Sequence, residues 1–162
     1  MALIKYRFLF IGILVFCVLT LSATYYIEHV LKHPPCNLCL FERVPYIIST
    51  ILAFSVLVFG KYEKITSITI GLFFVLGAII SYYHFGIEQG FFNESLVCDL
   101  SGSSIGSISA EDLLNELKTK KISCKDVTFR IFGFSLATFN TIISLIISTI
   151  MLRIFINYDK NR

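Results

Sequence analysis

Residues 65–85 read ITSITIGLFFVLGAIISYYHF, an apolar run that contains no Asp, Glu, Lys or Arg. A helix needs about 20 such residues to cross a bilayer, because it rises about 1.5 Å per residue through about 30 Å of hydrocarbon. The run meets that length and therefore predicts a membrane-spanning helix.

Three further runs of the chain have the same character. They cover residues 8–27, 40–59 and 134–156. Charged residues in them lie near the ends, where a long side chain such as that of Arg153 can reach the interface. With 56% hydrophobic residues and a mean hydropathy of +0.78, the chain belongs in a bilayer. We expect an all-α membrane protein, a four-transmembrane-helix antiparallel bundle that forms a single integral membrane domain over residues 1–162.

The first run could also be a cleaved signal peptide, because Lys5 and Arg7 precede it. Its apolar stretch is longer than a usual signal core, and residues 21–23 (LSA) carry a bulky Leu where the cleavage site requires a small residue. An uncleaved first helix is therefore expected. Four spans then put both termini on one side of the membrane.

Charge limits the partners and orients the chain. The net charge is only +3, and Lys and Arg do not interleave with aromatic residues in a stripe, which excludes nucleic acid as a partner. The 14 basic residues divide equally between the two sides. On the side of the termini, however, they sit in very short segments that directly flank helix ends, where the positive-inside bias acts. This distribution predicts cytoplasmic termini.

The connections differ in length between the two sides. Residues 60–64 (GKYEK) allow only a tight hairpin, so the second and third helices must be neighbours. On the other side lie a loop over residues 28–39 and a long loop over residues 86–133. Within the long loop, the Ser/Gly-rich residues 101–107 suit a hinge. Residues 109–122 predict a short amphipathic helix, which either lies on the membrane surface or caps the bundle.

Four of the five cysteines fall in these two loops. They are Cys36, Cys39, Cys98 and Cys124. An even number of cysteines on an oxidising side is what a disulfide system requires. The fifth, Cys17, lies in the middle of the first span and is interpreted as a small packing residue.

Cys36 and Cys39 form a Cys-x-x-Cys pair at the start of the second helix. The free N–H groups and the dipole of a helix N-terminus stabilise an anion and lower the pKa of a thiol there. Arg43 follows Cys39 by four residues and so lies one turn further along the same helix face. A permanent charge at the membrane boundary is costly without a role. Together these residues predict an anionic sulfur site within reach of a quinone head group.

Two other roles of the cysteines stay open at this point. A zinc site of four cysteines would usually show two Cys-x-x-Cys pairs, whereas Cys98 and Cys124 stand 26 positions apart. Static disulfides are the stronger alternative, since a bridge between Cys98 and Cys124 would contribute about 3 to 4 kcal/mol through chain entropy. A short Cys-x-x-Cys pair gains little in this way and is more often redox-active, which favours a redox relay.

Residues 35–43 (PCNLCLFER) resemble the first-loop motif of the DsbB family, the disulfide bond formation proteins B. The family's remaining landmarks are resembled, in order and spacing, by residues 83–88 (YHFGIE), 98–99 (CD), Cys124 and residues 132–136 (FGFSL). The resemblance covers nearly the whole chain. Two departures bear on partner preference: the chain has no Trp, and it reads LA at residues 136–137 where the family commonly has Pro.

The resemblance implies a quinone-dependent thiol oxidase of the bacterial inner membrane, with both loops in the periplasm. A thioredoxin-like DsbA-type partner attacks a disulfide between Cys98 and Cys124, which gives a mixed disulfide at Cys98. Cys124 then attacks Cys36 of a disulfide between Cys36 and Cys39. The Cys39 thiolate donates towards ubiquinone or menaquinone in the surrounding lipid, helped by Arg43. No metal is implied.

Two polar residues near the outer helix ends have open roles. His84 either lines the quinone site or is a satisfied interfacial histidine. Glu42 is expected to pair with a nearby cation rather than to act as a base. Two further classes of protein are also open. An enzyme of the vitamin K epoxide reductase type would carry its Cys-x-x-Cys near the last helix, and a structural membrane protein would keep both bridges oxidised.

Overall fold

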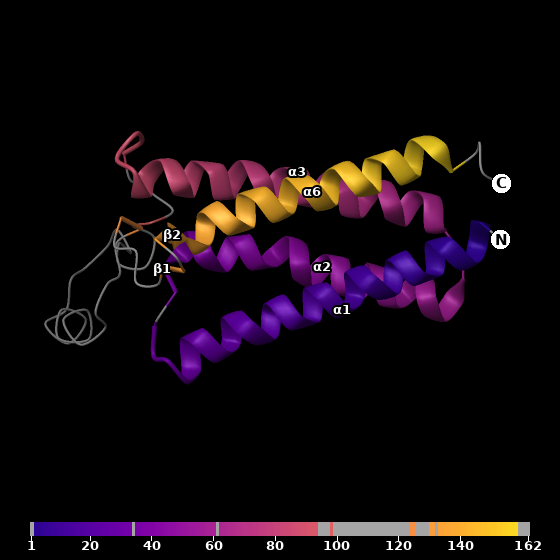
Figure 1. The fold of residues 1–162 in the computed structure, drawn as a ribbon, viewed down its shortest axis with the longest axis horizontal. Helices are drawn as coiled ribbons and strands as arrows, with labels where there is room; N and C mark the ends of the chain where they lie inside the picture. The colour runs from indigo at the N-terminus through magenta and orange to yellow at the C-terminus, as the bar shows by residue number, and fades with distance from the viewer. Residues whose placement is uncertain are drawn as a thin grey trace, which may run out of the picture.

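The computed structural model describes residues 2–33, 35–60, 62–93, 98, 124–125, 130–131 and 133–158. Its long helices are α1 (Ala2–His29), α2 (Asn37–Phe59), α3 (Glu63–Glu88) and α6 (Leu136–Asn157). They alternate in direction, and both chain termini lie at the same end of the bundle (Figure 1). All four are long and apolar enough to cross a membrane, so the predicted four-helix membrane bundle is confirmed. The predicted hinge at residues 101–107 and helix at residues 109–122 lie outside the described residues.

Neighbours in the sequence are neighbours in space: α1 packs against α2, α2 against α3, and α3 against α6. The hairpin between α2 and α3 is as tight as predicted. Gly60 follows α2 in the left-handed conformation, with φ at 61°, and its N–H donates to the Val56 carbonyl at 2.8 Å. Side chains rarely tolerate this φ, which is why glycine suits the position.

Small residues allow the helices to approach closely. A Cβ on Gly77 of α3 would come 3.0 Å from Pro45 Cγ of α2, and Ser67 and Ser81 of α3 are fully buried. Lipid tails give membrane helices no hydrophobic drive to associate, so close packing through small residues is what holds such bundles together. Large side chains such as Leu72 and Leu76 point outwards and are more than half exposed, as a lipid-facing surface requires.

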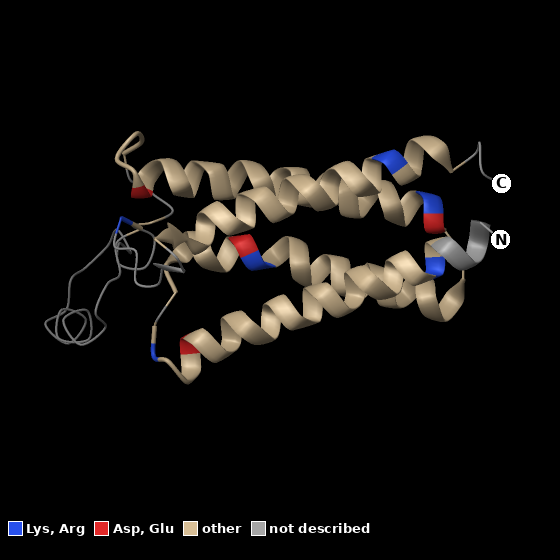
Figure 2. Ribbon diagram, viewed as in Figure 1, with Lys and Arg blue, Asp and Glu red and all other residues tan. Residues whose placement is uncertain are grey.

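Two buried regions divide the bundle along its length. The first, which we call the apolar core, extends from the middle of the bundle towards the termini and includes Phe10, Cys17, Ile70, Phe74 and Met151. The second lies at the opposite end and contains the other cysteines. Figure 2 shows that most of the Lys, Arg, Asp and Glu residues of the helices lie towards the two ends of the bundle, as is usual for membrane helices, while one acidic and one basic residue lie further inside on α2.

Helix boundaries differ from the predicted ones where local hydrogen bonds extend or delay a helix. α2 begins at Asn37 rather than residue 40, because Cys36 serves as its N-cap. α3 continues to Glu88, three residues beyond the predicted end. The chain then folds back, and the Phe91 N–H donates to the Gly86 carbonyl at 2.8 Å.

A short hairpin that was not predicted precedes the last helix. Strand β1 (Arg130–Ile131) pairs antiparallel with β2 (Phe134–Ser135), and Gly133 makes the turn with φ at 86°. Ser135 then caps α6 by accepting the Thr138 N–H at 3.3 Å. The helix therefore begins at Leu136, two residues later than predicted.

Candidate functional site

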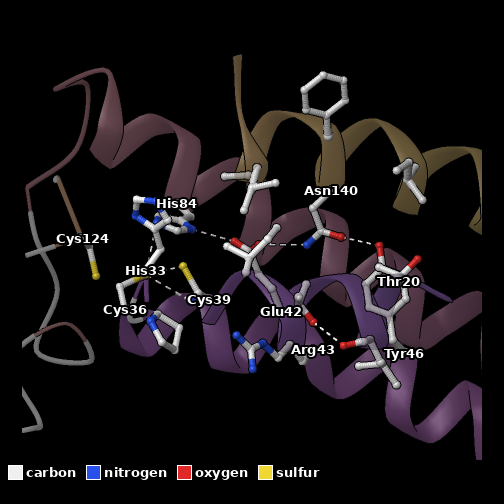
Figure 3. A pocket seen from close by; sticks show the side chains of 18 of the residues that line it. Thr20, His33, Cys36, Cys39, Glu42, Arg43, Tyr46, His84, Cys124 and Asn140 are labelled. Carbon is white, nitrogen blue, oxygen red and sulfur yellow. Dashed lines mark hydrogen bonds and ion pairs between the residues drawn. The ribbon is translucent and has the colours of Figure 1, made fainter. Parts of the chain in front are cut away.

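A cavity of about 200 Å³ lies at the end of the bundle away from the termini, between side chains of all four helices. Most of its wall is apolar, with Leu21 and Ile27 on α1 facing Phe139 and Ile143 on α6. Figure 3 shows the polar side chains that converge on it. Five of the six predicted site residues line this one cavity: Cys36, Cys39, Arg43, His84 and Cys124.

Cys36 and Cys39 sit at the first turn of α2. Their Sγ atoms are 2.6 Å apart, and Cys36 Sγ accepts the Cys39 N–H at 3.2 Å. A disulfide bond is about 2.05 Å long, so a small side-chain rotation closes the pair. Cys36 is buried, whereas Cys39 is partly exposed on the cavity wall. The pair has the placement that reversible oxidation requires.

The surroundings of Cys36 favour its thiolate. The pKa of this thiol is held well below its ordinary value, first because Cys39 offers it a hydrogen bond and then because His84 Nε2 lies 3.5 Å from its sulfur. The backbone N–H of Cys39 acts in the same direction, and burial opposes it. The side chains of Cys39 and His84 are thus the main causes of the lowered pKa of Cys36, and the N–H at the helix N-terminus, which was the cause expected from the sequence, adds to them.

His84 reaches this sulfur from α3 and is held between two carboxylates. Its Nδ1–H donates to Glu42 Oε1 at 2.7 Å, while Nε2 faces Cys36 Sγ and lies 3.7 Å from Glu88 Oε1. The side chains of His84, Glu88 and Glu42 are 4%, 6% and 9% exposed, so all three groups are withdrawn from solvent. Because the carboxylate of Glu42 fixes the proton on Nδ1, Nε2 is the atom that meets the cysteine. Glu42 thus has a partner, and it is a histidine.

A polar network continues from Glu42 towards the middle of the bundle. The Asn140 Nδ2 group on α6 donates to Glu42 Oε2 at 2.9 Å and to Ser81 Oγ at 2.6 Å. The Tyr46 hydroxyl donates to Asn140 Oδ1 at 2.5 Å. Both oxygens of the buried carboxylate are therefore hydrogen-bonded, which a charge at this depth requires. The network ties α2, α3 and α6 together beside the cavity.

Arg43 lies one turn beyond Cys39, as predicted. The ion-pair partner of its guanidinium was not predicted. Its Nη1 donates to Glu28 Oε2 of α1 at 2.7 Å, and the two side chains are 21% and 26% exposed. The ion pair joins α1 to α2 at the rim of the cavity. Arg43 lines the cavity in this position, so its charge is available to a molecule bound there.

The second cysteine pair lies against the first. Cys98 and Cys124 form a disulfide with their Cα atoms 6.0 Å apart. Both are buried in one apolar cluster with Cys36, Leu38 and Ile87. Cys124 also lines the cavity, next to the Cys-x-x-Cys pair. The fold therefore brings together all four cysteines that the sequence placed in two separate loops.

Several residues of this site were not singled out from the sequence. They are Tyr46, Ser81, Glu88 and Asn140. A signal was present for two of them: Asn140 interrupts an apolar run, and Glu88 follows His84 by one helical turn. Polar residues inside membrane segments mark functional sites often enough that both could have been proposed. Their partners could not, because these lie on other helices.

Comparisons with known proteins identify the family of the chain. The family described as disulfide bond formation protein DsbB matches residues 6–154. A protein of Rickettsia prowazekii (strain Madrid E), named uncharacterized protein RP370, is 25% identical over 158 residues, which cover 97% of this chain and 91% of that protein. No solved structure matches the chain.

Proposed function

Since the chain belongs to the DsbB family of disulfide bond formation proteins, we propose that it is a quinone-dependent thiol oxidase. In this proposal it reoxidises a thioredoxin-like DsbA-type protein in the bacterial periplasm and passes the electrons to ubiquinone or menaquinone. Both termini are cytoplasmic and the cysteine pairs face the periplasm, as the distribution of basic residues favours. The catalytic residues are Cys36, Cys39, Cys98 and Cys124.

One observation carries the proposal: the two cysteine pairs share a buried cluster, and Cys124 and Cys39 line the same cavity. Thiol–disulfide exchange needs a thiolate within reach of the sulfur that it attacks. A purely structural role for the two cysteine pairs gives no reason for a cavity that both Cys39 and Cys124 line. It also gives no reason to surround Cys36 with groups that favour its thiolate.

The exchange reactions run from the loop pair to the helix pair. A partner thiolate attacks Cys98 Sγ and releases Cys124, and the second partner thiol then displaces Cys98, which leaves the partner oxidised and the loop pair reduced. Cys124 next attacks Cys36 of the oxidised helix pair and releases the Cys39 thiolate. Cys98 attack on Cys124 then frees Cys36 and restores the loop disulfide. The net result is a reduced helix pair that holds two electrons.

The cavity fits the head group of a quinone. An apolar cavity of about 150 Å³ holds a benzene molecule, so about 200 Å³ beside Cys39 is enough for a substituted ring. Apolar walls suit the ring, and the guanidinium of Arg43 on the cavity wall can donate to a quinone oxygen. A bound quinone supplies the acceptor for two electrons and two protons from the helix pair.

The chain's own residues prepare the sulfur chemistry. His84 Nε2 can accept the proton of the Cys36 thiol or donate to its thiolate, and Glu42 holds the ring in the required orientation through Nδ1. Arg43 is proposed to favour negative charge near Cys39 and on the quinone oxygens. His84 therefore acts on sulfur directly, and Arg43 acts at the mouth of the cavity.

A trapping experiment tests the exchange steps. A DsbA-type partner whose second active-site cysteine is replaced by Ser should remain joined to this protein through Cys98, which mass spectrometry of the cross-linked peptide would identify. Cys98→Ser should yield no adduct, whereas Cys17→Ser should yield as much as the wild type. Static disulfides predict no adduct in any variant, and that result would refute the proposal.

A further inference from the structure

The Cys36, Cys39 and His84 side chains converge so closely that their ligand atoms all lie within 4.8 Å of one another. Glu88 lies outside this three-residue group, but its Oε1 is 3.7 Å from His84 Nε2, so a rotation of its side chain would bring it to the same ion. We propose that the reduced form of this site binds one Zn²⁺ ion through Cys36, Cys39, His84 and Glu88, and that bound zinc blocks reoxidation of the dithiol. The inference deepens the proposed function, on which its regulatory part rests.

The distances suit tetrahedral zinc. With Zn–S near 2.3 Å and Zn–N and Zn–O near 2.0 to 2.2 Å, tetrahedral angles require about 3.6 Å between sulfur and nitrogen and about 3.4 Å between nitrogen and oxygen. The observed separations are 3.5 Å from Cys36 Sγ to His84 Nε2 and 3.7 Å from Nε2 to Glu88 Oε1. Two of the separations that such a site needs are thus already present.

The sulfur pair makes the site depend on oxidation state. Two thiolate ligands of one zinc ion stand about 3.8 Å apart, whereas the Cys36 and Cys39 sulfurs are 2.6 Å apart. In the reduced protein the partly exposed Cys39 side chain must rotate away from Cys36 to reach this separation, while a disulfide between the two sulfurs leaves no thiolate to bind metal. Zinc should therefore bind to the reduced protein and not to the oxidised one.

The groups behind the ligands have the arrangement of a zinc site. Glu42 accepts the Nδ1–H of His84, which leaves Nε2 free to ligate, and this carboxylate–histidine pairing orients zinc-bound histidines in many proteins. Glu88 Oε2 is buried and has no hydrogen-bond partner within the described part of the chain. A cation between Glu88 and the sulfurs would satisfy that carboxylate. It would also balance the charge of two thiolates, which is costly at the edge of the hydrocarbon.

Binding follows simple proton chemistry. Zn²⁺ replaces the thiol protons of Cys36 and Cys39, so up to two protons leave per ion and no electrons are transferred. Both sulfurs are then coordinated, and neither is free to donate electrons towards the cavity. The sequence predicted no metal site from the spacing of its four cysteines, which says nothing of the His84 and Glu88 side chains that α3 brings to two of them.

The test uses the full-length protein with Cys98 and Cys124 replaced by Ser, so that only the site in question and Cys17 carry thiols. Zinc alone is titrated against a chromophoric chelator, and Co²⁺ serves as a spectroscopic probe of tetrahedral thiolate coordination. We expect one ion per reduced protein and none after oxidation. His84→Ala and Glu88→Gln should each weaken binding at least tenfold, while the controls His29→Gln and Glu63→Gln should not change it.

Unchanged affinity in His84→Ala and Glu88→Gln would overturn the four-ligand site, because the dithiol would then bind metal unaided. Equal binding to oxidised protein would overturn the dependence on reduction. With the native cysteines present, zinc should inhibit thiol oxidation, and a chelator should restore it. Thiol oxidation that zinc does not affect would refute this inference and leave the proposed function standing. Zinc binding without any thiol oxidation would refute the proposed function instead.

Discussion

The two halves of this bundle are built from the same four helices but from different chemistry. Around the cavity, polar and sulfur-containing side chains lie among apolar ones, and each of Glu42, His84 and Asn140 has hydrogen-bond partners on a neighbouring helix. In the apolar core, the buried side chains are mostly hydrocarbon and sulfur, with Phe10 and Phe74 packed among residues of the other helices, and the buried hydroxyl of Ser67 donates to a helix carbonyl. A polar group buried in a membrane protein is costly unless it is paired, so such a network needs a functional reason.

Two pairs of matched residues make the comparison direct. Cys17 in the apolar core and Cys36 at the cavity are both buried thiols, yet only Cys36 lies beside a histidine. Glu42 and Glu63 are both 8% exposed, at opposite ends of the bundle. Glu42 belongs to the site, whereas Glu63 begins α3 and receives a weak hydrogen bond from the Tyr158 hydroxyl at 3.4 Å. Substitutions at matched positions should therefore separate function from packing.

The largest effect is expected from Cys39→Ser. It removes the sulfur that faces the cavity, so turnover with quinone should be abolished. The Cys98–Cys124 disulfide should still form a mixed disulfide with the reduced partner. Stopped-flow measurement of partner oxidation, together with gel analysis of the adduct, checks both parts. Normal turnover in this variant would contradict the role of Cys39.

Glu42→Ala should have the next largest effect. Removing one member of a buried charged pair costs about 3 to 5 kcal/mol, and His84 would lose the acceptor that orients it. We expect turnover to fall at least about a hundredfold, with some loss of thermal stability. In Glu63→Ala, stability should fall while the turnover of folded protein stays normal. Equal loss of turnover in Glu42→Ala and Glu63→Ala would contradict the claim that the cavity end of the bundle is functional and the opposite end only structural.

Arg43→Ala tests whether the guanidinium serves a bound quinone or only joins α1 to α2 through Glu28. If it serves the quinone, the variant should bind quinone more weakly by about 1 to 3 kcal/mol of free energy, and the KM for quinone should rise accordingly. Arg43→Lys should rescue part of this if charge matters, and none if the planar fork matters. Glu28→Ala is the control, because it breaks the same ion pair and leaves the guanidinium in place. Wild-type KM values in both Arg43 variants would refute a role in quinone binding.

His84→Ala should shift the pH dependence of Cys36 alkylation. The pKa of Cys36 lies below its ordinary value, so in the wild type its thiolate persists to unusually low pH. Loss of His84 removes one cause of that shift and should move the alkylation midpoint to higher pH, while the hydrogen bond from Cys39 keeps it below the ordinary thiol value. Iodoacetamide labelling of reduced protein, with a metal chelator present, would measure the midpoint. An unchanged or lower midpoint would show that His84 does not stabilise the Cys36 thiolate.

The smallest effect is expected from Cys17→Ala. The change removes one buried sulfur from the apolar core and should lower stability by about 1 kcal/mol. Turnover and quinone KM should match the wild type, since Cys17 does not line the cavity. A thermal melt in detergent and the standard turnover assay provide the check. Loss of turnover in folded Cys17→Ala would show that this thiol takes part in the reaction.

The fold was largely predictable because each membrane span is a local property of the chain. Any 20 apolar residues carry the signal, and the tight turn at residues 60–64 forces two helices together. What could not be predicted were the helix ends. Cys36 extends α2 by capping it, and the hairpin at Gly133 delays α6. These outcomes depend on single hydrogen bonds and turns that hydropathy does not register.

The site was predictable only in part, because its members come from separate helices. The cysteines and Arg43 carry local signals: motif, spacing and a charge within a membrane segment. The contact between His84 and Cys36 joins residues 48 positions apart, and the bond between Asn140 and Glu42 joins residues 98 positions apart. No periodicity or motif in one sequence reports such pairs. The sequence indicated which sulfurs to propose as reactive, and the fold showed the groups that surround them.

The most direct test of the central claim is quinone reduction in proteoliposomes with oxygen excluded. The liposomes would contain this protein and ubiquinone or menaquinone, and a reduced DsbA-type partner would be added outside. The account predicts that one quinone is reduced for each partner disulfide formed, and that partner oxidation stops after at most two disulfides per protein when quinone is omitted. Continued partner oxidation without quinone, or partner oxidation with the quinone left unreduced, would contradict it.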